Sequence, residues 1–135
     1  MKSSSALILF CWLLLPMSFL RAQFTQILYH TETLDAKDSL VLNLDLTAGI
    51  ETWASNQVLL ETTIRLSKVN TGLLEHLVKS GRYEVEVVKG ETSLRLVQKP
   101  INPLAAPAQE EISLKLYIPD SFKPIGEGVW LRFNP

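Results

Sequence analysis

Two runs of alternating apolar and polar residues constrain the fold of this chain more than any other feature. The first places leucine at every second position over 40–46, and the second alternates in the same way over 58–66. Because successive side chains of a β-strand point to opposite faces, each run predicts a strand with one buried face. Turn-forming residues at 48–49 and 55–57 leave a short strand between the runs, at 50–53. We therefore expect a three-stranded meander with one apolar face.

Patterns elsewhere predict one helix and further strands. Residues 71–80 repeat apolar side chains at helical spacing, with Asn70 or Thr71 able to cap the start and Gly81 placed where a helix would stop. Period-two alternation predicts strands at 24–31, at 83–87 and 94–96 in a hairpin, at 112–118 and at 129–133. A connection rich in proline and alanine, 99–109, favours an unpaired extended segment. The predicted class is all-β with one short helix, built either as a β-solenoid of stacked strands or as a two-sheet β-sandwich.

The first 22 residues have the layout of a secretory signal peptide. Lys2 gives a positive start, residues 6–15 are almost all apolar, and Ala22 precedes the expected cleavage site. A retained membrane anchor is the alternative, although the apolar run is shorter than the roughly 20 residues that a spanning helix needs. We expect residues 1–22 to be removed and residues 23–135 to form one β-rich domain in the periplasm, on the outer surface or outside the cell.

The composition after this cleavage excludes several kinds of site. Cys11 is the one cysteine of the sequence, so the mature chain has no thiol for a disulfide, a nucleophile or a thiolate metal site. Lys2 and Arg21 are two of the 13 basic residues, which leaves 11 against 14 acidic ones. A chain of net negative charge without a Lys/Arg cluster predicts no nucleic-acid binding, and we expect no membrane span after signal removal. The lack of disulfides and of an Asn-x-Ser/Thr sequon favours a bacterial envelope protein.

No residue pattern has the spacing of a catalytic or metal site. His30 and His76 lie far apart in the sequence, and the chain has no P-loop, no G-x-G-x-x-G and no G-x-S-x-G turn. Paired carboxylates could in principle act as in a glycoside hydrolase, but outward glutamates on strands are usually solvated. The candidates for such a pair are Glu51, Glu61, Glu84, Glu86, Glu110 and Glu111. We expect no enzymatic activity, no metal and no cofactor, and a glycoside hydrolase is the weakest alternative.

Aromatic residues and the carboxyl-terminal segment are the remaining candidates for binding. If Trp53, Tyr83 and Trp130 formed an exposed row, they would suit a carbohydrate-binding module; otherwise they fill the core. Residues 129–133 could instead pair with another chain through free strand-edge groups. In a regular strand Trp130 and Phe133 would fall on opposite faces, so one could pack inward while the other meets a partner. We predict a protein partner or self-association through this tail; the alternative is that the tail completes its own sheet.

Four segments give the chain a family resemblance. They are Gly-Ile-Glu-Thr-Trp at 49–53, Val-Leu-Leu-Glu at 58–61, Gly-Arg-Tyr-Glu-Val at 81–85, and the run from Glu111 to the Ile-Pro pair at 118–119. Together they resemble the secreted adhesin domains of Bacteroidota known as DUF4097 or head-GIN auto-transporter adhesins, over roughly residues 35–122. The resemblance implies a β-solenoid and an adhesin role. Because such solenoids continue for several strand pairs beyond the Ile-Pro point, it also implies a short variant or an opening module.

Overall fold

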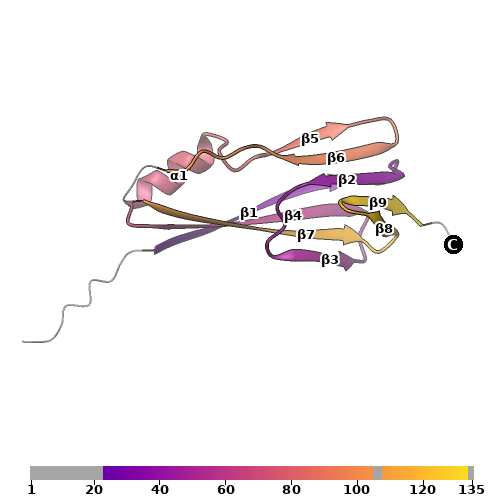
Figure 1. Cartoon of the computed structure of the whole chain (residues 1–135), viewed down its shortest axis with the longest axis horizontal. Coiled ribbons are helices and arrows are strands. Elements are labelled where there is room, and N and C mark those ends of the chain that lie inside the picture. Colours follow the sequence, from indigo (N-terminus) through magenta and orange to yellow (C-terminus); the bar gives the residue numbers. More distant parts are fainter. Residues whose placement is uncertain (1–22, 105–107, 134–135) are drawn as a thin grey trace, which may run out of the picture.

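The computed structural model describes residues 23–104 and 108–133, and these form nine β-strands and one α-helix (Figure 1). In chain order the elements are β1 (Gln23–Thr33), β2 (Ser39–Asn43), β3 (Gly49–Trp53), β4 (Gln57–Ser67), α1 (Thr71–Lys79), β5 (Val85–Lys89), β6 (Ser93–Gln98), β7 (Gln109–Pro119), β8 (Phe122–Gly126) and β9 (Val129–Arg132). The predicted all-β class with one short helix is therefore confirmed.

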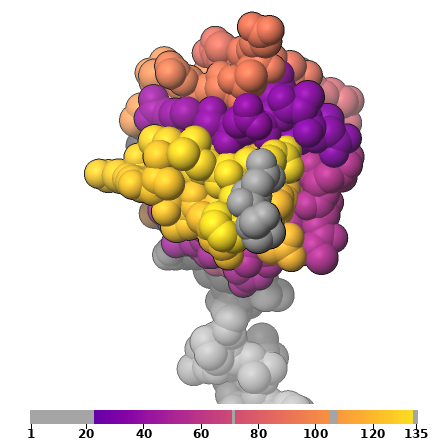
Figure 2. Space-filling view, turned by 90° about the vertical axis from the view of Figure 1, so that its right-hand side faces the viewer, coloured from indigo at the N-terminus to yellow at the C-terminus, as the bar shows by residue number. Residues whose placement is uncertain are grey.

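The strands form two sheets that pack as a β-sandwich. Sheet A has four strands in the order β1-β4-β7-β3, and sheet B has five in the order β5-β6-β2-β9-β8. Figure 2 looks at one end of the molecule, where the orange β5–β6 hairpin, the purple β2 region and the yellow carboxyl-terminal strands follow one another in the order of sheet B. Of the two predicted architectures, the sandwich fits this arrangement. A solenoid would stack successive strands in parallel coils, whereas β1, β4 and β7 pair antiparallel.

The predicted meander is wrong, although its three strands exist. Strand β2 lies in sheet B between β6 and β9, while β3 pairs in parallel with β7 in sheet A. Strand β4 has β1 and β7 as its neighbours. The reason is length: β3 has five residues and could pair with less than half of β4, which has eleven. In contrast, β1 pairs with β4 along its whole length, so more ladder hydrogen bonds form.

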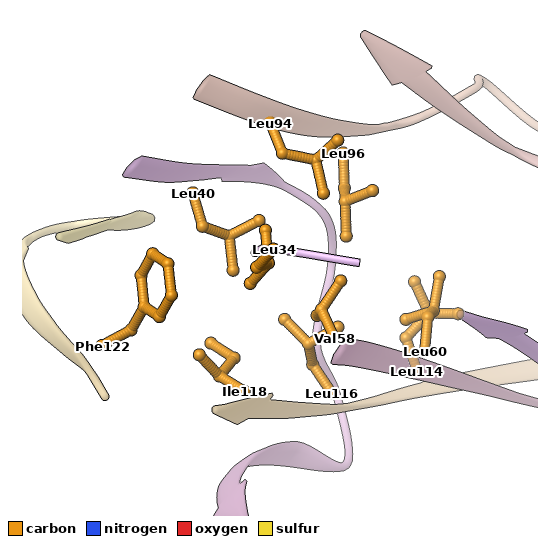
Figure 3. Packing of buried hydrophobic residues seen from close by; sticks show 10 residues of the cluster. All are labelled: Leu34, Leu40, Val58, Leu60, Leu94, Leu96, Leu114, Leu116, Ile118 and Phe122. Carbon is orange, nitrogen blue, oxygen red and sulfur yellow. The ribbon is translucent and has the colours of Figure 1, made fainter. Parts of the chain in front are cut away.

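The core occupies the space between the sheets and has two clusters rather than one continuous layer. The larger cluster joins leucines of sheet B to aliphatic residues of sheet A, and Phe122 closes one end of it (Figure 3). Its buried members are Leu34, Leu40, Val58, Leu60, Leu94, Leu96, Leu114, Leu116, Ile118 and Phe122. The smaller cluster, Ile64, Leu66, Leu74 and Tyr83, lies beneath α1. Ile112 packs against both clusters and links them.

Helix α1 confirms the predicted helix within one residue. Its amino end is capped by Asn70, whose side-chain oxygen accepts a hydrogen bond from the backbone N–H of Leu73 at 3.1 Å. Gly81 follows the helix with a φ of +78°, a conformation that favours glycine. Leu74 of the helix is buried, and Leu77 packs beside it on the smaller cluster. The predicted hairpin, the strand over 112–118 and a short strand within 129–133 are also confirmed.

Candidate binding site at the edge of sheet A

Strand β1 forms one edge of sheet A and has the composition of a pairing surface. Residues 23–29 contain neither a proline nor a charged side chain, and the only acidic or basic residues in the strand are His30 and Glu32. Threonine, isoleucine, phenylalanine and tyrosine, which favour strands, make up more than half of the segment. No strand among the described residues pairs with the outer side of β1.

Every second residue of β1 turns its backbone polar groups away from β4. The N–H of Leu34 donates to the carbonyl of Asn56 at 2.9 Å, and this bond continues the β1–β4 register without a shift. Hydrogen bonding alternates along an antiparallel ladder, so the even-numbered residues of β1 bond to β4. The N–H and C=O groups of the odd-numbered residues, from Thr25 to Thr31, therefore point to the free edge. Among these residues, Ile27 and Tyr29 are 43% and 64% exposed, and their side chains lie on the outer face.

The other three edges carry features that discourage strand addition. Strand β8 contains Pro124, which lacks an N–H, and its register with β9 shifts between Pro124 and Gly126. Strands β3 and β5 have five residues each, and β5 carries Glu86 and Lys89. Short edges, charges, prolines and bulges are the usual protections of natural sheets. Strand β1, with eleven residues, is thus the least protected edge in the described part of the chain.

A cavity of about 360 Å³ opens beside β1, on the side of the sandwich where β1 and β5 form the edges of the two sheets. It is lined by Leu28, Tyr29, His30, Leu60, Thr62, Tyr83, Glu84 and Val85. Leu28, Leu60, Tyr83 and Val85 give the cavity an apolar part, so it suits an apolar side chain better than a charged one. Inner-face residues of neighbouring strands lie side by side. If a strand were added to β1, its inward-facing side chains would therefore lie at the mouth of the cavity.

One chain of polar contacts crosses this open side. Glu32 lies between His30 and Lys89: its Oε1 is 3.0 Å from Nε2 of His30, and its Oε2 is 3.2 Å from Nζ of Lys89 in β5. The side chain of Glu32 is 17% exposed, whereas those of His30 and Lys89 are about half or more exposed. These contacts connect the edges of the two sheets, and neither Glu32 nor Lys89 lines the cavity.

A second polar cluster, formed by Arg82, Tyr83 and Glu110, is largely buried and connects the smaller core cluster to β7. Nε and a terminal nitrogen of Arg82 donate to the carboxylate of Glu110 at 2.9 and 2.7 Å, and the Tyr83 hydroxyl donates to it at 2.5 Å. Arg82 also donates to the carbonyl of Asn102 in the proline-rich connection. Arg82 and Tyr83 both donate to Glu110, so the cluster stabilises the fold and leaves no side chain placed for chemistry.

Burial, hydrogen bonds and the charge of Arg82 shift the pKa values of Glu110 and Tyr83. Burial alone would raise the pKa of Glu110, but the hydrogen bonds from Arg82 and Tyr83 and the charge of Arg82 outweigh it, so the pKa lies below its ordinary value. Burial, followed by the hydrogen bond to Glu110, raises the pKa of the Tyr83 hydroxyl. Glu110 is therefore ionised and Tyr83 neutral at pH 7.

The aromatic residues singled out from the sequence do not gather on one face. Trp53 is half-buried in β3, where its ring centroid lies 5.8 Å from that of Tyr117 at an angle of 47° and its indole N–H donates to the Gln57 carbonyl. Tyr83 is buried in the smaller core cluster. Trp130 is half-buried and packs against the larger cluster, whereas the side chain of Phe133 is 55% exposed. The sugar-binding alternative needed an aligned, open row, which Trp53, Tyr83 and Trp130 do not form.

The proposed role of residues 129–133 as a pairing edge is wrong. Strand β9 lies inside sheet B between β2 and β8, so both of its sides are paired. Gly128, expected to be a hinge, is fixed: its carbonyl accepts the N–H of Leu42 at 2.7 Å, and a Cβ on it would lie 2.5 Å from the Leu42 carbonyl. Arg132 adds a bond from its backbone N–H to the Asp38 carbonyl at 2.8 Å. The tail completes its own sheet, which was the alternative.

The candidate catalytic side chains are dispersed. His30 lies on β1, and His76 is exposed on α1. Three of the six glutamates are in ion pairs, namely Glu51 with Lys115, Glu110 with Arg82 and Glu111 with Arg65. Residues 23–104 and 108–133 contain no group of three or more His, Cys, Asp or Glu that could hold a metal ion. Within the same ranges, no helix has the length and hydropathy needed to cross a membrane.

The alternation over 24–31 predicts a strand, which β1 confirms, but it does not predict that this strand forms an open edge. The usable signal was the charge-free, proline-free run before His30, compared with Pro124 in β8. The Glu32–Lys89 contact and the cavity carry no sequence signal. Glu32 and Lys89 lie 57 positions apart, and the cavity is lined by three segments more than 20 positions apart, so these residues meet only after the sheets pack.

Comparison with known proteins adds no relatives. No family model matches the chain, and no curated protein or solved structure matches it.

Proposed function

We propose that this chain is an exported, non-catalytic interaction domain with an adhesin-like role, and that it binds a protein partner by adding an extended strand to β1. The observation that carries the proposal is the contrast between β1 and the other three edges. Strand β1 offers eleven residues without proline or a bulge, while β3, β5 and β8 are short, charged or interrupted. Strand addition obtains affinity from such free backbone groups.

The cavity beside β1 supplies the second element that strand addition needs. Backbone pairing alone does not select a sequence, so proteins that bind strands use pockets for alternate side chains. The cavity lies next to the inward-facing Leu28 and His30, where the partner's inward side chains would point. An apolar side chain at one of these positions would be preferred over a charged one, because Leu28, Leu60 and Val85 line the cavity.

Export is tested by the mass of the processed protein. When the full chain is produced in a bacterial host and recovered from the envelope or medium, we expect the intact mass to correspond to residues 23–135. Retention of residues 1–22 in the recovered protein would contradict cleavage after Ala22, and recovery from the cytoplasm alone would contradict export.

Strand addition is tested with a synthetic peptide. The probe is an eleven-residue peptide of alternating threonine and valine, and its control is the same peptide with proline at every second position. We expect the first to bind with a Kd on the order of 10–100 µM and the control not to bind, because proline removes the donors of the ladder. Hydrogen exchange should show new protection at Thr25, Ile27, Tyr29 and Thr31, the residues whose N–H groups point to the edge.

A proline at position 29 provides the matched variant. Tyr29→Pro removes one outward N–H and none of the bonds to β4, so the protein should stay folded and bind the peptide at least about 10-fold more weakly. Undiminished binding by this variant, or protection at β8 or β5 instead of β1, would overturn the proposal.

A further inference from the structure

We infer that the strand added to β1 is β1 of a second copy, paired antiparallel about a two-fold axis at Leu28, so that two copies of sheet A become one eight-stranded sheet. The inference deepens the proposed function and rests on it. Such an interface is isologous: the same strand must complement itself when its direction is reversed. The central residues of β1, from Thr25 to Thr31, meet this condition.

The outer face of the pair is complementary. With the axis at Leu28, Ile27 faces the partner's Tyr29, and Thr25 faces the partner's Thr31. Because the axis relates the two strands, each of these pairs occurs twice. Aromatic with β-branched and threonine with threonine are favourable cross-strand pairs. The backbone N–H and C=O groups of these four residues point away from β4. In the dimer they face the same groups of the partner strand, so each can form a hydrogen bond across the interface.

The inner face has no opposed like charges. Leu28 faces the partner's Leu28, Gln26 faces the partner's His30, and Phe24 faces the partner's Glu32. Glu32 already has Lys89 within 3.2 Å, so it enters the pair with its charge compensated. Leu28 lines the cavity, and the partner's Leu28 therefore reaches the apolar mouth that stands open in a single copy.

Parity restricts the register further. In the proposed register, odd-numbered residues face odd-numbered residues and even-numbered residues face even-numbered ones. A shift by one residue would set odd against even. The outer face of one β1 would then join the inner face of the other, and Tyr29 would be turned into the core. Among the even registers, the one centred on Leu28 pairs all eleven residues, from Gln23 to Thr33. A single pair of strands is a small interface, so we expect a reversible dimer with micromolar affinity.

Charge pairs introduced on the outer face test both the dimer and its register. In the register proposed, Ile27→Lys with Tyr29→Lys puts lysine opposite lysine at two places, and we expect the dimer to weaken at least about 100-fold. Ile27→Lys with Tyr29→Glu puts lysine opposite glutamate at the same places, and we expect an affinity within about 10-fold of wild type. Both residues are exposed in the single copy, so neither double variant should unfold it. Val88→Lys, which alters an exposed apolar residue of β5, is the matched control and should leave the dimer unchanged.

Sedimentation velocity of the exported chain, from about 1 to 300 µM, measures these affinities over the range in which small interfaces form. If the Lys/Glu variant is as dissociated as the Lys/Lys variant, the register is overturned. If wild type stays monomeric over the whole range while the Thr/Val peptide still protects β1, the proposal of a dimer through β1 is overturned. The proposal that β1 binds an added strand then stands. If neither the second copy nor the peptide binds, both proposals fall.

Discussion

Replacing Glu110 with glutamine is expected to lower the free energy of unfolding by about 3 kcal/mol at pH 7, because Arg82 would keep its charge in a largely buried site without a carboxylate partner. The side chains of Arg82 and Glu110 are 16% and 10% exposed, and two hydrogen bonds join them. Urea unfolding followed by tryptophan fluorescence measures the change. Glu111→Gln is the matched control: its carboxylate is 70% exposed and 3.9 Å from Arg65, so we expect no measurable loss.

The same pair predicts how stability depends on pH. Because the pKa of Glu110 is lower in the folded than in the unfolded state, its contribution is complete above the ordinary value of 4.5 and is lost as the pH falls through the folded pKa. The difference in stability between wild type and Glu110→Gln should therefore be constant near neutral pH and shrink in acid. A difference that stays constant down to pH 3 would show that the ion pair is not its source.

The elements with a clear local period could be predicted from the sequence, and their partners could not. Asn70 and Gly81 delimit α1 because a cap and a left-handed glycine act within a few residues of the helix. In contrast, the alternation at 40–46 cannot tell which sheet its strand joins. Leu40 of β2 pairs with Leu94 and Trp130, which lie 54 and 90 positions further along the chain.

The candidate site could not be predicted from the sequence either, because it too depends on which strands pair. Whether a strand is an edge depends on which neighbours it lacks, and that is a property of the whole sheet. The tail at 129–133 had the features of a pairing segment, yet Arg132 fixes it to the turn before β2 by donating to the carbonyls of Leu34 and Lys37. Strand β1, read from the sequence as an ordinary first strand, is the segment left with a free side.

Replacing Phe122 with alanine is expected to cost about 4 kcal/mol, which is the largest effect among these variants. Phe122 is fully buried at the end of the larger core cluster, where Figure 3 shows its ring directed toward Leu34 and Leu40. The guanidinium of Arg132 lies 4.9 Å from the ring centroid, so the substitution also removes a cation–π contact. Because β8 pairs only with β9 among the described strands, little else compensates for the loss.

Two comparisons separate this burial from a general effect of losing a phenyl ring. Phe133→Ala deletes the same side chain eleven residues later, where it is 55% exposed, and should change the free energy of unfolding by less than about 0.5 kcal/mol. Phe122→Leu keeps most of the apolar volume and should cost about 1 kcal/mol. Urea unfolding midpoints of the three variants measure the order. If Phe122→Ala were no more destabilising than Phe122→Leu, the neighbouring residues would have to fill the space left by the ring. Strand β8 would then be a loosely packed edge and not part of the well-packed core.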